Sequence, residues 1–404
     1  MMASLVLGSH VLFERQLVRG RTVGVVCNPA SIDAGFAHVL ERAEEAGVTV
    51  GAIFGPQHGL KSDVQDNMIE SAHAHAYSGK DDRRRRVAVY SLYSETREPG
   101  REMLAGLDAL VIDLQDVGTR IYTYVYTMAN CLRAGAKHGV PVVVCDRPNP
   151  IGGVTVEGPM LVPGHESFVG QFPIPMRHGM TIGELARLFN EHFGIGAKLE
   201  VVKMAGWRRE QYFDETGIPW VLPSPNLPTL DAAVVYPGTV LFEGTNVSEG
   251  RGTTKPFELI GAPWVTDPDP FAASLNALNL PGVHFRAHAF EPTFQKHART
   301  TCGGVQVHVT DRHAFQAVET GVVLIDAFRR ANPSAFAWRE PPYEYEYVKP
   351  PIDILFGSSR LRLALEAGVE ARALAAEWQA GVTGFLDVRR RFLLYPEAAA
   401  LGAR

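Results

Sequence analysis

Five short apolar segments rich in β-branched residues recur through the first 150 residues of this 404-residue chain. Two stretches between them, 36–47 and 122–139, show helical spacing of apolar residues, and the second closes on Gly139. Nearly continuous apolar strands separated by helices are typical of a parallel sheet that is covered on both faces. The sequence therefore predicts a doubly wound α/β domain, with strands at 22–27, 49–54, 87–93, 109–114 and 141–146.

The remainder of the chain predicts a second, smaller α+β domain. Thr181 and Glu184 form a capping-box start for a helix, and residues 199–204 indicate one more strand of the first domain. The Pro-rich stretch 220–233 is suited to a crossing between domains. Beyond it we expect strands at 282–290 and 303–311, and amphipathic helices within 314–331 and 361–393. A chain of this length suits two domains, which we place at 1–230 and 231–404.

Composition and charge exclude several classes of protein. A net charge of -5 and a pI near 6.3 provide no field for nucleic acid. The sequence has no apolar run close to the ~20 residues that a membrane span needs. Its first residues lack the basic and apolar regions of a signal peptide, and its four cysteines are widely spaced, so a cytoplasmic location is expected. The usual zinc, P-loop and dinucleotide motifs are missing, so no metal and no cofactor is expected.

Each predicted strand is followed by a polar loop shaped by glycine or proline. In an open α/β sheet, the ligand binds beyond the carboxyl ends of the strands. Five such loops on one sheet edge therefore predict a sizeable polar site, and they lie at 28–31, 55–59, 94–99, 115–120 and 147–153.

The segment 242–257, FEGTNVSEGRGTTKPF, is the most polar candidate. It follows the apolar run 232–241, which we interpret as a strand, and its directed hydrogen-bonding groups are held among three glycines. Polar loops mounted on strand ends are where ligand sites are usually built. A solvated loop with Asx-type turns is the alternative. The candidate site residues here are Glu243, Asn246, Glu249, Arg251 and Thr253.

The loops after the strands supply further candidates. His58 could perform general acid–base chemistry near neutral pH, and its alternative is a turn histidine capped by the backbone. Asp116 could act in the site or form an ion pair with Arg120 that holds the loop. Tyr122 could stack on a sugar face or belong to the core.

Four more residues complete the predicted site. Arg147 and Asn149 stand between prolines that fix the backbone, and a guanidinium held in this way suits a carboxylate or phosphate. His178 precedes a helix start, and Asn226 lies on a rigid Pro-rich segment. The balance of charges suits a polar ligand that is uncharged or singly anionic, such as a sugar acid.

These motifs, in their order along the chain, resemble the exo-β-N-acetylmuramidase (NamZ-type) family. The resemblance spans about Val23 to Phe315 and rests on IFGPQHG, DLQDVGTRIYTY, DRPNPIGG, WVLPSPNLPT and FEGTNVSEGRGTTKPFE. It implies a Rossmann-like catalytic domain, an auxiliary domain and a pocket at their interface. It also implies release of terminal N-acetylmuramic acid, whose lactyl carboxylate fits an arginine-rich site. The expected ligand is an amino sugar or an oligosaccharide that carries one, and the oligomeric state is left open, a homodimer included.

The chain departs from the family pattern at one position. Many members read GPEHG, with the glutamate as the proposed catalytic group, where this chain reads GPQHG with Gln57. Glutamine cannot trade protons, so another carboxylate is needed for catalysis. Glu243 and Glu249 are the first replacements by motif, followed by Asp63, Asp66 and Asp116.

Three hypotheses follow for the function. The first is an exo-acting glycoside hydrolase on N-acetylmuramyl or related amino-sugar ends, by a two-carboxylate or substrate-assisted mechanism. The second is a non-catalytic sugar-acid binding protein, and the third is a hydrolase of another sugar-acid linkage.

Overall fold

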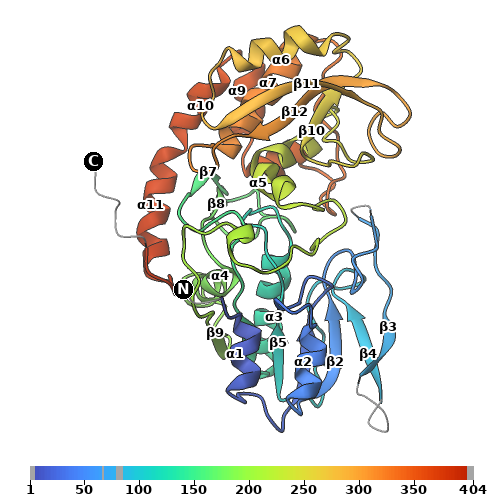
Figure 1. Ribbon diagram of the computed structural model, residues 1–404, viewed down its shortest axis with the longest axis vertical. Coiled ribbons are helices and arrows are strands. Elements are labelled where there is room, and N and C mark those ends of the chain that lie inside the picture. Colours follow the sequence, from blue (N-terminus) through green and yellow to red (C-terminus); the bar gives the residue numbers. More distant parts are fainter. Residues whose placement is uncertain (1–4, 66–67, 79–84, 398–404) are drawn as a thin grey trace.

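The computed structural model describes residues 5–65, 68–78 and 85–397. The chain forms two units, one around a large sheet and one around a small sheet, which are stacked on each other (Figure 1). Within the described ranges, no helix has the length and apolar character needed to cross a membrane.

The first unit is built on a seven-stranded sheet with the order β3-β4-β2-β1-β5-β6-β9. All neighbouring strands are parallel except the edge strand β3, which runs antiparallel to β4. The six parallel strands have the Rossmann order, with the switch point between β1 and β5. The predicted fold class is therefore confirmed, and the strands are β1 (Thr22–Val26), β2 (Thr49–Gly55), β3 (Ala74–Ser78), β4 (Arg85–Ser91), β5 (Ala109–Ile112), β6 (Val142–Cys145) and β9 (Leu199–Val202).

Helices cover both faces of this sheet. Successive side chains of a strand point to opposite faces, so strands that are apolar throughout must be covered on both sides. Val111 of β5 packs toward α1 (Gly8–Glu14) and α2 (Val39–Glu45). Its neighbours Leu110 and Ile112 pack with α3 and α4 on the opposite face. Gly139 ends α3 (Tyr124–His138) in the left-handed conformation, and the capping box of Thr181 and Glu184 starts α4 (Ile182–Arg187), which continues as a π-helical turn (Leu188–His192).

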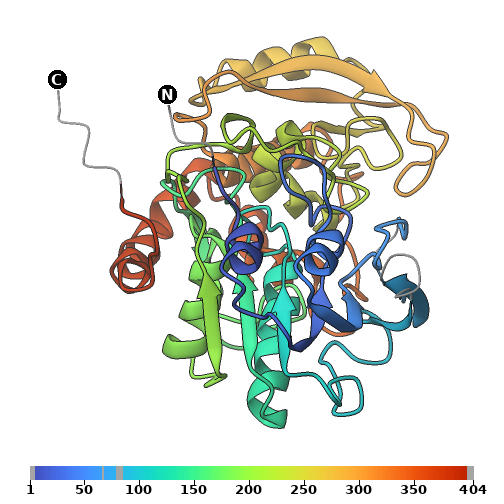
Figure 2. The ribbon, with the colours of Figure 1, turned by 60° about the horizontal axis from the view of Figure 1, so that its bottom comes forward.

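The second unit has a three-stranded antiparallel sheet, β10-β12-β11, surrounded by helices (Figure 2). A two-stranded ribbon of β7 (Glu157–Met160) and β8 (Pro175–Arg177) lies near it (Figure 1). The elements of the second unit are α5 (Leu230–Thr239), β10 (Leu259–Ala262), α6 (Pro268–Asn276), β11 (Val283–Phe290), β12 (Cys302–Val309), α7 (Ala317–Ala331), α8 (Pro351–Phe356), α9 (Arg360–Glu366), α10 (Ala371–Glu377) and α11 (Gln379–Arg390).

The strand predicted at 232–241 is wrong, because this run forms α5 followed by a 3₁₀ helix (Val240–Gly244). The run is buried on all sides, and such a run gives no period that separates helix from strand. Pro237 lies within the helix, and Gly238 lets it approach α7 closely. A Cβ on Gly238 would lie 1.8 Å from the carbonyl oxygen of Ala317.

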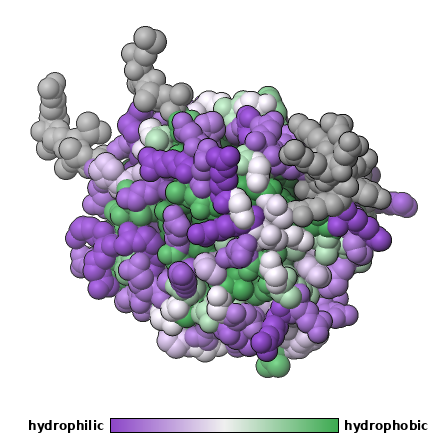
Figure 3. All heavy atoms as spheres, turned by 90° about the horizontal axis from the view of Figure 1, so that it is seen from below, coloured by the Kyte–Doolittle hydropathy of each residue, from purple (hydrophilic) through white to green (hydrophobic). Residues whose placement is uncertain are grey.

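The last part of the chain returns to the first unit. Helix α11 packs against β7, and the Tyr395 hydroxyl donates to the buried Asp146 carboxylate at 2.6 Å. The predicted helical stretch 361–393 is divided into α9, α10 and α11, which lets the chain bend back along the side of the molecule (Figure 1). The side of the first unit that faces away from the second is mostly hydrophilic, with hydrophobic residues showing between the polar ones (Figure 3).

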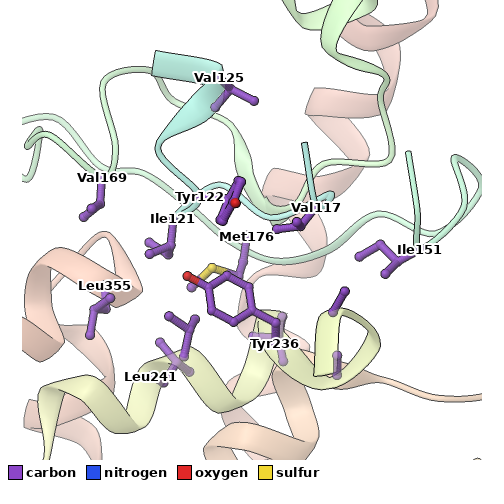
Figure 4. Close-up of a cluster of buried hydrophobic side chains, with 14 of the residues drawn as sticks. Val117, Ile121, Tyr122, Val125, Ile151, Val169, Met176, Tyr236, Leu241 and Leu355 are labelled. Atoms are coloured by element: carbon purple, nitrogen blue, oxygen red, sulfur yellow. The ribbon is translucent and has the colours of Figure 1, made fainter. Parts of the chain in front are cut away.

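A continuous apolar core joins the two units. Figure 4 shows Tyr122 and Val125 of the first unit above Tyr236 of α5 and Leu355 of α8. These side chains are almost completely buried, so the two units share one packed interior. The shared core fixes the distance between the loops that follow the large sheet and those of the second unit.

Candidate active site

A pocket that encloses about 410 Å³ of empty space, its opening to solvent included, lies where the two units meet. The loops after β2 and β5 supply one side, and α5, the 3₁₀ helix and the segment around Glu344 supply the other. Its lining comprises Gln57, His58, Ile121, Tyr122, Thr123, Val169, Ser224, Asn226, Leu227, Tyr236, Glu243, Arg251, Phe257, Tyr343 and Glu344.

Gln57 is held on both sides by hydrogen bonds that fix its orientation. Thr123 donates from its hydroxyl to Gln57 Oε1 at 2.6 Å, so the amide nitrogen faces the other way. Gln57 Nε2 then donates to Glu344 Oε1 at 3.1 Å. The second carboxylate oxygen of Glu344 accepts from the Tyr93 hydroxyl at 2.7 Å. The two units therefore meet through a buried hydrogen-bonded chain at the pocket wall.

Glu344 reaches the pocket on a two-residue hairpin turn. Tyr343 and Glu346 exchange backbone hydrogen bonds, and the two residues between them, Glu344 and Tyr345, have φ values of 46° and 66°. Positive φ at both central positions is the type I′ pattern, which normally selects Asn or Gly. Two ordinary side chains held in this conformation store backbone strain, which is frequent at functional sites.

The environment of Glu344 favours its neutral form. Burial, first, and the nearby Glu243 charge raise the pKa of Glu344 to about 7, although the bonds from Tyr93 and Gln57 and the Arg251 charge oppose the rise. A carboxylic acid with a pKa near 7 can both give and take a proton under ordinary conditions.

Glu243 lies in the wall of the same pocket, where a guanidinium and a hydroxyl hold its carboxyl group. Arg251 Nη2 donates to Glu243 Oε1 at 2.5 Å, and the Tyr343 hydroxyl donates to Oε2 at 2.6 Å. The residues Glu243, Arg251 and Tyr343 also line a neighbouring second compartment, together with Met68, Glu249, Gln295 and Arg339.

Glu249 belongs to this second compartment. It lies 2.7 Å from Lys296 Nζ and 3.4 Å from Arg251 Nε. Burial opposes ionisation, but the charges of Lys296 and Arg251 together lower the pKa of Glu249 below its usual value. Glu249 is therefore a permanent anion at neutral pH, and Lys296 also holds the loop by donating to the carbonyls of Phe242 and Val247.

His58 lines the pocket in its neutral form. Its Nδ1 lies 2.7 Å from the carbonyl oxygen of Val64, which makes Nδ1 the protonated nitrogen. Burial, first, and the Arg251 charge lower the pKa of His58 to about 4, against the bond to Val64. The predicted acid–base role of His58 near neutral pH therefore does not fit, because the ring has no second proton to give there.

The two arginines expected to bind a carboxylate are used inside the protein. Arg147 forms a two-point ion pair with Asp113, at 2.7 and 2.8 Å, and also donates to the Ile32 carbonyl. Arg120 donates to four backbone carbonyls, among them those of Leu355 and Phe356 at the end of α8. Both side chains are fully buried and held by these contacts, which does not favour the ligand-binding roles predicted for them.

Five other predicted residues also lie outside the two compartments. Asn149 bonds Met180 and Ile151, and His178 bonds the Met180 amide. Asp116 does not pair with Arg120. It accepts from the Gly118 amide and lies 3.3 Å from His178 Nε2. Asn246 clamps Ala335 and Ala337, and Thr253 closes its own turn through Gly250 and Lys255. These polar side chains stabilise the loops in which they lie, through hydrogen bonds to the backbone.

The remaining candidates divide between the pocket and its surroundings. Asn226 lines the pocket and exchanges hydrogen bonds with Gln65. Tyr122 forms one wall, but its ring packs 4.7 Å from the Tyr124 ring and belongs to the shared core. Asp63 is exposed, and Asp66 lies outside the described residues.

Sequence reasoning missed the groups that come from outside the recognised motifs. Tyr343 and Glu344 lie in PPYEYEYVKPP, residues 341–351, where acidic and aromatic residues alternate between prolines. That pattern could have marked the segment, since prolines fix the backbone around it. Tyr93 and Thr123 are ordinary in sequence, and only their contacts with Glu344 and Gln57 reveal them.

Across residues 5–65, 68–78 and 85–397, no group of three or more His, Cys, Asp or Glu side chains is arranged to hold a metal ion. The switch point between β1 and β5 is filled by the Asp113–Arg147 pair. The polar side chains that line the pocket carry carboxyl, hydroxyl, amide, imidazole and guanidinium groups.

Comparison with known proteins assigns both halves of the chain. Residues 23–231 match the family model described as exo-β-N-acetylmuramidase NamZ, N-terminal, and residues 234–395 match its C-terminal counterpart. The chain is 44% identical over 385 residues to the peptidoglycan β-N-acetylmuramidase NamZ of Bacillus subtilis (strain 168), covering 95% of this chain and 89% of that protein.

Two crystal structures of DUF1343 family proteins from Bacteroides fragilis share the fold. One has a TM-score of 0.84 at 31% identity and covers 97% of this chain and 99% of its own. The other has a TM-score of 0.75 at 27% identity, covering 98% and 100%. The resemblance predicted from the motifs is thereby confirmed, and the chain is a glycoside hydrolase that belongs to the exo-β-N-acetylmuramidase NamZ family.

Proposed function

We propose that this protein removes N-acetylmuramic acid from the ends of peptidoglycan fragments by hydrolysing its β-glycosidic bond. The observation that carries the proposal is the convergence of the family motifs on one pocket. Gln57 and His58 come from GPQHG, Tyr122 from DLQDVGTRIYTY, and Glu243 and Arg251 from the FEGTN segment. The family relationship disfavours the alternative of a sugar-binding protein without activity.

The shape of the site supports attack at a chain end. Apolar and aromatic side chains such as Ile121, Tyr236 and Phe257 close the floor of the pocket, because they belong to the buried core between the units. In our proposal, one terminal sugar occupies this pocket while the rest of the fragment stays outside.

In our proposal, the lactyl carboxylate of the substrate lies in the second compartment. Arg251 and Lys296 are occupied by Glu243 and Glu249, whereas the exposed Arg339 guanidinium lies at 5.9 Å from the Tyr343 ring centroid. A ligand with one negative charge would balance Arg339 there. In our proposal, Arg339 therefore contacts the substituent that distinguishes N-acetylmuramic acid from neutral amino sugars.

The cellular setting is part of the proposal. All four cysteines are free and buried, in keeping with a reducing compartment. We place the enzyme in the cytoplasm, in peptidoglycan recycling, and the oligomeric state stays open, a homodimer included. Fractionation of cells and light scattering of the purified protein test these two points.

The test of function is product release from defined substrates. The purified protein should liberate N-acetylmuramic acid from a 4-nitrophenyl β-N-acetylmuramide and from a disaccharide with this sugar at its non-reducing end. The matching β-N-acetylglucosaminide, which lacks the lactyl group, should be a poor substrate. Thermal stabilisation by free N-acetylmuramic acid, with no release from any muramide, would instead support the binding-protein alternative.

A further inference from the structure

We propose that Glu344 is the proton donor of this site, the group that protonates the oxygen leaving the anomeric carbon. The inference rests on the proposed hydrolysis of a muramyl glycoside and names the residue that performs the proton transfer. It assigns a catalytic role to a residue of the second unit that lies 287 positions from Gln57 in the sequence.

The contacts of Glu344 position it for this role. Gln57 and Tyr93 each donate to one of its carboxyl oxygens, which fixes the plane of the group at the pocket wall. Each carboxyl oxygen has two lone-pair positions, so a position on each remains for a proton. The strained turn at Glu344 and Tyr345 delivers the side chain into the pocket, although both residues would be more stable with negative φ.

The other groups of the site cannot take this role at neutral pH. Glu243 is held in an ion pair with Arg251, and the charges of Lys296 and Arg251 lower the pKa of Glu249. Gln57 has no exchangeable acid proton, and His58 is neutral, with a pKa of about 4. Glu344 alone among these side chains combines contact with the pocket and a pKa of about 7.

The reaction balances with water as the second reactant. The bond between C1 and the leaving oxygen breaks, its electron pair stays on that oxygen, and the proton moves to it from Glu344. The oxygen of water forms the new bond to C1, and one proton of that water returns to the Glu344 carboxylate. The products are the free sugar and the shortened fragment, and Glu344 is protonated again.

The charged and titratable groups around Glu344 come from several elements. Tyr93 follows β4 and Tyr236 lies in α5. Glu243 lies in the 3₁₀ helix, Arg251 lies in the loop after it, and the Tyr343 hydroxyl donates to Glu243. Glu243 repels a charge on Glu344 and Arg251 attracts it, so both set the pH at which the proton is lost. The rate should therefore fall as pH rises through about 7.

The test compares Glu344→Gln with wild type on two leaving groups. A disaccharide leaving group needs a proton, whereas 2,4-dinitrophenolate leaves readily without one. For a proton donor, kcat on the disaccharide should fall by ~10²–10⁴-fold, with a much smaller loss on the dinitrophenyl muramide. Glu340→Gln, the same change at an exposed position four residues earlier, should leave both rates unchanged.

Tyr93→Phe provides a second route if Glu344→Gln does not fold. The Tyr93 hydrogen bond lowers the pKa of Glu344, so its removal should move the upper limb of the pH–rate profile to higher pH. An unmoved limb in this variant would contradict the proposal.

The possible results distinguish the role of Glu344 from the muramidase function on which it rests. Active wild type with equal losses on both leaving groups, or with less than tenfold loss in Glu344→Gln, would overturn the role of Glu344 and leave the muramidase function standing. Wild type inactive on every muramide would overturn both. A loss confined to the poor leaving group establishes Glu344 as the proton donor.

Discussion

Gln57 donates a hydrogen bond from Nε2 to Oε1 of Glu344 at 3.1 Å, across the boundary between the two units. The family pattern to which the motifs are similar implies a glutamate where this chain has Gln57. The neutral amide lets the Glu344 carboxylate sit beside it without charge repulsion, while Thr123 fixes the amide orientation. The carboxyl group that the motif lacks is therefore provided by another part of the chain.

Restoring glutamate at position 57 should change the pH dependence of the reaction. In Gln57→Glu, two carboxyl groups would face each other at hydrogen-bond distance, and like charges disfavour ionisation of both. The pair should keep one proton to higher pH, so the upper limb of kcat/KM against pH should shift upward. Gln379→Glu, an exposed change on α11, serves as control. An unchanged limb would show that position 57 and Glu344 do not titrate together.

Arg147→Ala should destabilise the fold without selecting against acidic ligands. The change leaves Asp113 buried without its guanidinium partner, which typically costs ~3–5 kcal/mol. Urea denaturation measures this loss, and Arg147→Lys should recover only part of it because Lys cannot form the two-point pair. Near wild-type stability combined with weaker binding of carboxylate sugars alone would contradict the structural role.

Arg339→Ala should weaken substrates that carry a lactyl carboxylate. A hydrogen bond to a charged group contributes ~1.5–3 kcal/mol, and exposure of Arg339 places the effect near the low end, about tenfold in KM. The KM for a β-N-acetylglucosaminide, which has no lactyl group, should not change. Arg330→Ala, which removes an exposed guanidinium on α7, is the matched control. Equal effects on both sugars would place the carboxylate elsewhere.

The stability of the protein should fall as pH rises from about 4.5 to 7. Burial, as the largest cause, raises the pKa values of Glu344, Asp146 and Glu157 to about 7, so the folded state binds more protons than the unfolded state in this window. Ionisation of each group then lowers the free energy of unfolding, by at most ~3–4 kcal/mol. Melting temperatures measured across this window test the slope. Glu157→Gln should flatten it, and an unaltered slope in that variant would contradict the assignment.

The sequence by itself determined the class of the first unit and the identity of the family. Short β-branched apolar runs such as 109–114, which alternate with stretches of helical spacing, are typical of a parallel sheet covered on both faces, so their length, composition and order indicated the fold class. The motifs also identified Glu243 and Arg251 as pocket residues. The run 232–241 was predicted incorrectly. A segment buried on every side shows no alternation of apolar and polar residues that would distinguish a helix from a strand.

Only the tertiary structure decided which polar residues meet. Arg147 and Glu243 are both charged side chains in polar loops of the sequence. In the structure, Arg147 forms a buried ion pair with Asp113, whereas Glu243 lines the pocket. Gln57 and Glu344 are brought together by the shared core between the units. Local sequence sets backbone preference and burial, but a contact between distant segments depends on how whole elements pack, and that packing made Glu344 part of the site.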